Sequence, residues 1–65
     1  MTETEVAKCR RVQKYVMNHA FLLQGQALAP SDGESFTQSV DKLTHAVKLF
    51  RLAEAIETLI REKSA

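Results

Sequence analysis

The chain has 65 residues, 45% of them hydrophobic, and a formal net charge of +1 at pH 7. A chain of this length forms one domain at most and buries only about 60% of its unfolded surface, which makes it marginally stable alone. The charge gives no global signal for binding nucleic acid or an anionic membrane. The single cysteine excludes an internal disulfide.

The N-terminal residues predict a first helix over about residues 3–24. Thr2 and Glu5 stand in the S/T-x-x-E pattern, in which a hydroxyl and a carboxylate cap each other's backbone donors. Gly25 supplies a plausible C-terminal stop. The apolar side of this helix, on which Cys9 is expected to be a small core residue, consists of Val6, Cys9, Val12, Val16, Ala20 and Leu23.

The same region bears on localisation. The first residues are acidic where a secretory signal would be basic, and no apolar run approaches the length of about 18 residues that spans a bilayer. A reducing compartment is compatible with the lack of disulfides. We therefore expect a cytoplasmic protein with no membrane partner.

A basic strip on the predicted first helix is the candidate partner-binding site. It consists of Lys8, Arg10, Arg11, Lys14 and Asn18. Cations meet phosphates by charge, and the neighbouring polar and aromatic side chains can meet bases, so the strip suits a nucleic acid. An acidic protein surface could use the same cations. The alternative interpretation is that they only keep the outer face of the helix in water.

Residues 25–33 contain both glycines and the only proline, so they are the predicted connection. Capping-box patterns begin at Ser31 and at Ser35, which leaves two possible starts for a second helix over about residues 34–63. Nothing in this second segment breaks a helix before its end.

The apolar stripe of the second segment changes direction halfway along. Its first part is Phe36, Val40, Leu43, Val47 and Phe50, and its second part is Leu49, Leu52, Ala53, Ile56, Leu59 and Ile60. Helices of roughly 33 and 45 Å would leave the second part overhanging beyond about residue 53. We therefore expect the first stripe to pack on the chain's own first helix and the second to pack on another chain. The alternative is a break near Phe50 to Ala53 that makes a third short helix.

The predicted dimer interface combines the second stripe with the end of the first helix. It comprises Phe21, Leu22, Leu49, Leu52, Ala53, Ile56, Leu59 and Ile60.

Catalytic and metal-binding patterns are weak. His19 and His45 have no metal-ligand spacing, and Glu54 and Glu57 beside arginines are typical of a solvated charged strip. No nucleophile stands near a base, and no glycine-rich phosphate loop is present. We expect no enzymatic activity, no cofactor and no metal.

One short stretch resembles a known family. His45, Ala46, Leu49, Phe50 and Arg51 are similar to the H-A-x-x-L-[FY]-R run of the Rop family of plasmid copy-number regulators, which are also short two-helix chains. The resemblance implies a dimeric four-helix bundle that binds RNA loop pairs through its first helices. It assigns no binding residue in this chain.

The sequence thus predicts one all-α domain over residues 1–65, an antiparallel two-helix hairpin with a longer second helix. We expect it to assemble as a homodimer resembling a four-helix bundle. The expected function is that of a small regulatory or adaptor protein of bacterial or phage type that binds another protein as an inhibitor, chaperone or assembly factor. The alternative is a Rop-like dimer that binds RNA or DNA through the basic face of its first helix.

Overall fold

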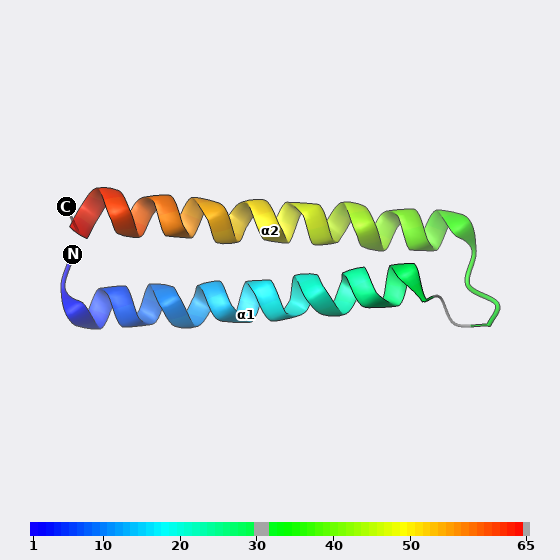
Figure 1. The fold of residues 1–65 in the computed structure, drawn as a ribbon, viewed down its shortest axis with the longest axis horizontal. Helices are drawn as coiled ribbons and strands as arrows, with labels where there is room; N and C mark the ends of the chain where they lie inside the picture. Colours follow the sequence, from blue (N-terminus) through cyan, green and yellow to red (C-terminus); the bar gives the residue numbers. More distant parts are fainter. Residues whose placement is uncertain (30–31, 65) are drawn as a thin grey trace.

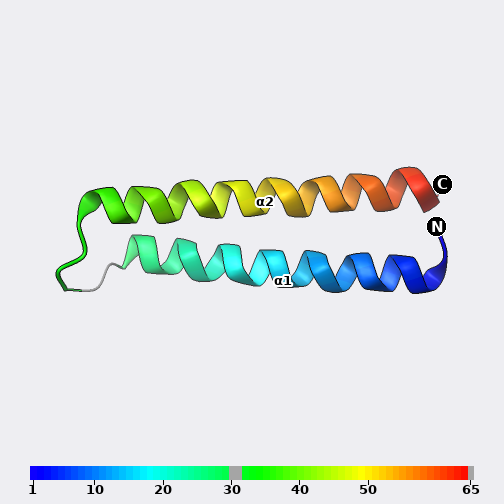
Figure 2. The ribbon, with the colours of Figure 1, turned by 180° about the vertical axis from the view of Figure 1, so that it is seen from behind.

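A computed structural model describes residues 1–29 and 32–64. Within these residues there are two helices and no strand: α1 (Glu3–Leu28) and α2 (Phe36–Ser64). The helices run antiparallel, side by side over their whole length (Figures 1 and 2). The Cα atoms extend over 48 × 15 × 10 Å. The predicted all-helical fold with two packed helices is confirmed.

Both helices begin with the capping box that the sequence predicts. The Glu5 amide donates to Thr2 Oγ1 at 3.1 Å, and the Thr2 amide donates to Glu5 Oε1 at 2.9 Å. Ser35 and Gln38 exchange the same two bonds at the start of α2. The later of the two predicted starts of α2 is therefore used. The earlier pattern begins at Ser31, which lies outside the described residues.

The first helix continues past its predicted stop at Gly25. It runs to Leu28, and the Ala29 amide then donates to the Gly25 carbonyl oxygen at 3.0 Å. The extension is favoured because Ala27 is buried against α2, so the last turn gains tertiary packing. Gly33 is the glycine that a turn requires, with φ of +85°. The rest of the predicted connection includes Pro30 and Ser31, which lie outside the described residues.

The predicted overhang of the second helix is wrong. The helices have 26 and 29 residues, and the Met1 ammonium donates to the Lys63 carbonyl oxygen at 3.0 Å. The two termini therefore lie together at one end of the hairpin (Figure 1). Because α2 is continuous from Phe36 to Ser64, the alternative of a third short helix is also wrong.

The helices meet through a seam of mostly small residues that repeat every seven positions. The side chain of Gln13 donates to the carbonyl oxygen of Ala53 at 3.1 Å, which places residue 13 opposite residue 53. Steps of seven residues from this pair give the other seam pairs. They are Val6 with Ile60, Ala20 with Ala46, and Ala27 with Ser39. Apart from Val6 and Gln13, which are half-buried, all the seam residues are buried. Such a seven-residue period keeps one line of contact along paired helices.

The stripe expected to face the first helix is instead exposed. Phe36 is 84% exposed, and Val40, Leu43 and Val47 are also exposed. Small side chains allow the closest approach of two backbones, so the helices meet through them rather than through the large side chains of the stripe. No large side chain among the described residues is fully buried. The hairpin therefore encloses very little core of its own.

Candidate functional site

The large apolar side chains gather on two opposite faces of the hairpin. One, the phenylalanine face, is anchored by the rings of Phe21 and Phe50, which meet edge to face with centroids 5.1 Å apart. The other, the histidine face, is anchored by His19 and His45, whose rings lie 5.7 Å apart, also edge to face. Each anchor joins one residue of α1 to one of α2. Both faces therefore consist of residues from both helices.

Helical spacing assigns the remaining members of each face, because residues three, four or seven apart share a side of a helix. The phenylalanine face comprises Met17, Phe21, Leu28, Phe36, Val40, Leu43, Val47 and Phe50. The histidine face comprises Cys9, Val12, Val16, His19, Leu23, His45, Leu49, Leu52, Ile56 and Leu59.

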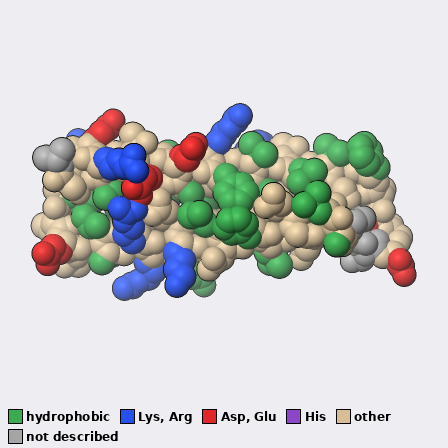
Figure 3. Space-filling view, in the orientation of Figure 1, with side chains coloured by type: hydrophobic (Ala, Val, Ile, Leu, Met, Phe, Trp, Pro, Cys, Tyr) green, Lys and Arg blue, Asp and Glu red, His purple; other side chains and the backbone are tan. Residues whose placement is uncertain are grey.

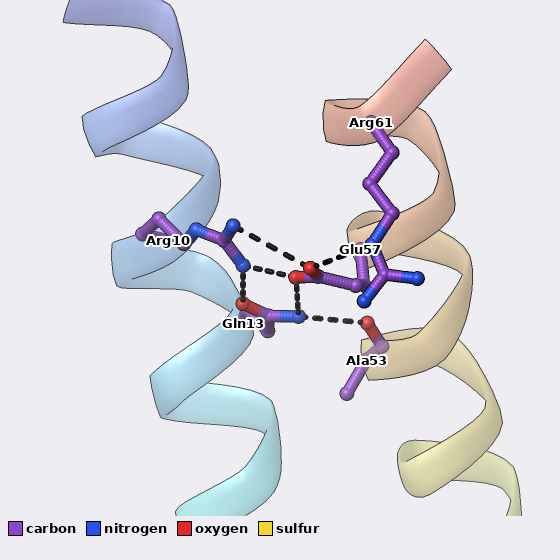
Figure 4. A network of polar contacts seen from close by, with 5 residues as sticks. All are labelled: Arg10, Gln13, Ala53, Glu57 and Arg61. Atoms are coloured by element: carbon purple, nitrogen blue, oxygen red, sulfur yellow. Dashed lines mark hydrogen bonds and ion pairs between the residues drawn. The ribbon is translucent and has the colours of Figure 1, made fainter. Parts of the chain in front are cut away.

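A polar network lies at the terminal end of the phenylalanine face (Figure 4). Glu57 of α2 pairs with the guanidinium group of Arg10 of α1, and it accepts hydrogen bonds from Gln13 Nε2 at 3.1 Å and Arg61 Nε at 3.2 Å. Gln13 also accepts from Arg10 Nη1 at 3.0 Å. The hydrogen bond from Arg10, followed by that from Gln13, lowers the pKa of Glu57 below its ordinary value. This network cross-links the two helices.

The phenylalanine face is divided along its length. Charged side chains gather near the termini, and hydrophobic side chains cover the middle and the half next to the connection (Figure 3). Where the two halves meet, a shallow groove of about 460 Å³ is lined by the apolar side chains of Met17, Val47 and Phe50. Ala53 also lines it, together with the charged side chains of Arg51, Glu54 and Glu57.

The histidine face has its own shallow groove. It has a volume of about 410 Å³, and Val12, Val16, His19 and Leu49 contribute to its lining, with Tyr15 at the edge. Cys9 is half-buried here, beside the groove rather than in an enclosed core. The meeting of His19 and His45 was not foreseen in the sequence. It depends on which residues of α1 stand opposite α2, and the spacing within each helix does not give that pairing.

The residues of the predicted dimer interface are separated by the structure into three places. Leu49, Leu52, Ile56 and Leu59 lie on the histidine face, with Leu22 beside its α1 edge. Phe21 lies on the phenylalanine face. Ala53 and Ile60 are buried in the seam, 5% and 4% exposed, so they belong to the interior of the hairpin. Because the two helices reach almost equally far, α1 covers Ala53 and Ile60.

The predicted basic strip does not form a single face. Lys8 and Arg10 point about 160° apart around α1, because successive residues turn by about 100°. Arg10 is held by Glu57. Lys8, Arg11 and Lys14 are exposed and make no ion pair with any described residue, and Asn18 is exposed beside them. Arg11 and Asn18 face away from α2, and the other two unpaired cations flank them, Lys8 toward the histidine face and Lys14 toward the phenylalanine face.

The described residues contain neither a metal-binding group nor a membrane-spanning helix. No three histidine, cysteine or acidic side chains are grouped as a metal site would require. Neither described helix has the combination of length and apolarity that crossing a membrane demands.

Comparison of the chain with family models, with curated proteins and with solved structures yields no match.

Proposed function

We propose that this chain is a small non-enzymatic regulatory or adaptor protein, of bacterial or phage type, that acts by binding a protein partner as an inhibitor, chaperone or assembly factor. The observation that supports this proposal is the exposure of its large apolar side chains. Phe36 is 84% exposed and Leu28 71%, and both lie on the phenylalanine face. Contiguous apolar surface of this kind is typical of interaction sites. A hairpin with so little enclosed core also needs a partner for stability.

The proposal includes a homodimer that forms through the histidine face. Val16 and Leu49 lie near the midpoints of α1 and α2, so the apolar part of this face is centred on the hairpin. A two-fold axis through that centre, perpendicular to the helices, would lay the face on its own copy with the connections at opposite ends. Cys9, Val16, Leu49 and other half-buried side chains would then become the core of a four-helix bundle.

Sedimentation of a variant at the histidine face tests the dimer. Leu52 is 48% exposed, so Leu52→Asp should leave the hairpin intact but place a charge in the interface. We expect dissociation, together with a lower melting temperature that depends on protein concentration. Thr58→Asp is the matched control, because Thr58 is exposed on the same helix and lies beside Glu54 and Arg61, away from this face. A wild-type chain that sediments as a monomer at micromolar concentration contradicts the dimer.

A second candidate function is binding of RNA or DNA, and one observation favours it. Tyr15 is 79% exposed and stands beside the unpaired cations Arg11 and Lys14. Aromatic rings between cations can stack on unpaired bases. Retention on heparin that collapses between low and moderate salt would favour this candidate. Purification from source cells with one stoichiometric protein would favour the protein-binding function.

A further inference from the structure

The phenylalanine face is asymmetric along the hairpin. Its hydrophobic side chains lie toward the connection, and its charged side chains lie toward the termini (Figure 3). The Arg10, Gln13 and Glu57 network occupies the charged half (Figure 4). A two-fold axis across the hairpin would place the apolar half of one copy on the charged half of the other. An axis along the hairpin would place like charges on each other. The face therefore fits a partner of different sequence better than a second copy.

We propose that the phenylalanine face binds an amphipathic helix of another protein, one with apolar side chains along one half and acidic side chains along the other. The inference rests on the proposed function and names the surface and the chemistry of the partner.

The apolar half has the shape that a helix partner requires. Met17, Val47 and Phe50 border a groove between α1 and α2, and a third helix can lay its apolar side in such a groove. On α1, the residues from Met17 to Leu28 cover roughly 18 Å, about three turns of a bound helix. Beyond the groove, Phe36 and Leu28 are largely exposed and extend the apolar surface to the connection.

The charged half favours acidic side chains in the partner. Glu57 is already held by Arg10, Gln13 and Arg61. Arg51 borders the groove and makes no ion pair with a described residue, and Lys14 lies one turn after Arg10. Four cations therefore stand against three carboxylates in this half. The cations are Arg10, Lys14, Arg51 and Arg61, and the carboxylates are Glu3, seven residues before Arg10, Glu54 and Glu57.

Two synthetic peptides of opposite charge test the proposal on the intact protein. Each peptide has about 20 residues, and one half of its length carries leucines at helical spacing. The other half carries glutamates in the first peptide and lysines in the second. We expect the glutamate peptide to bind at least tenfold more tightly than the lysine peptide at low salt, measured by fluorescence anisotropy. Equal affinities, or no binding of the glutamate peptide at high micromolar concentration, would overturn the inference.

Charge-reversal variants locate the site. Lys14→Glu with Arg51→Glu should weaken binding of the glutamate peptide at least tenfold and strengthen binding of the lysine peptide. The matched control is Arg11→Glu with Lys48→Glu, which changes the net charge equally at exposed positions away from the phenylalanine face, with Arg11 at the groove of the histidine face. An equal effect of both pairs would mean that net charge alone decides binding, which contradicts a site on this face.

Val47→Asp tests the apolar half, because Val47 is 48% exposed and lies in the groove. Binding of the glutamate peptide should be lost while helicity by circular dichroism and the sedimenting mass are unchanged.

Dissociation of an oligomer by this variant would assign the face to a second copy and overturn the inference. RNA that displaces the peptide from the wild-type protein but does not bind the Lys14 and Arg51 variant would assign these cations to a nucleic-acid site. That result would also overturn the inference. A dimer that binds a cellular protein but not the peptide refutes only this inference, whereas a monomer without any protein partner refutes the proposed function.

Discussion

At the scale of single residues, Ala20 and Ala46 decide how closely the helices pack. Ala20 is 0% exposed and Ala46 is 2% exposed, and they face each other at the middle of the seam. A methyl side chain gains little from burial itself. Its value is geometric, since it lets the two backbones approach until the larger side chains on both sides come into contact, as Phe21 and Phe50 do.

Ala46→Leu should therefore destabilise the hairpin. Three additional carbon atoms have no room between the helices, and overpacking of this kind costs about 1 to 3 kcal/mol. Urea unfolding followed by circular dichroism measures the loss. Ala55→Leu is the control, because Ala55 is exposed on the same helix, and it should change stability by no more than about 0.5 kcal/mol. Equal effects of the two substitutions would contradict the seam.

Glu57 makes the stability of the hairpin dependent on pH. The hydrogen bonds from Arg10 and Gln13 lower its pKa in the folded chain, so the unfolded chain binds the proton more tightly. The stabilisation is complete above the ordinary glutamate pKa of about 4.3 and is lost as the pH falls through the lowered value of the folded chain. Thermal unfolding between neutral pH and pH 3 should show this loss. Glu57→Gln should remove that part of the pH dependence. The control is Glu54→Gln, which should retain it, because Glu54 makes no ion pair with any described residue.

At the scale of elements, the starts of the helices were predictable and one end was not. The bonds of a capping box lie within four residues, so Thr2 and Ser35 could be found in the sequence with their partners. The end of α1 depends on what covers its last turn. Ala27 is 7% exposed against α2, and this contact outweighs the preference of Gly25 for a helix end.

The two glycines should respond in opposite directions to substitution by alanine. Gly25 lies inside α1, and the space that a Cβ atom would occupy there is open, so Gly25→Ala should raise stability by up to about 1 kcal/mol through helix propensity. Gly33 has φ of +85°, so Gly33→Ala should lower stability by about 1 to 2 kcal/mol. Thermal melts of the two variants against wild type decide the point. A gain from Gly33→Ala would mean that the turn does not require the left-handed conformation.

At the scale of the whole molecule, the two-helix architecture could be predicted, but the face turned inward could not be predicted from hydrophobicity. The stripe from Phe36 to Phe50 is the more apolar one, yet the chain buries Ser39, Ala46 and Ala53. A repeat of small residues at seven-residue intervals was the available signal. The division of the candidate surface into two faces could not be derived either, because it depends on which residues of α1 stand opposite α2.

Two aspartate substitutions separate the interior from the surface. Ile60 is 4% exposed, so Ile60→Asp buries a charge without a partner, and that cost is large compared with the small stability of a chain of this length. The hairpin should unfold, as seen by loss of helicity at room temperature. Val40 is 40% exposed, and Val40→Asp should remain helical. The reverse result would show that the stripe of Phe36 and Val40 faces α1.

The regular seam has a consequence for the uniqueness of the fold. Since small residues recur every seven positions on α2, at Ser39, Ala46 and Ala53, sliding α1 along α2 by two turns would again match small residues with small ones. These small residues alone therefore do not distinguish one alignment from the next. The contacts that do not repeat supply that information, above all the pairing of Glu57 with Arg10 and Gln13. This pairing lies at the end of the hairpin farthest from the connection, where the covalent link between the helices constrains their alignment least.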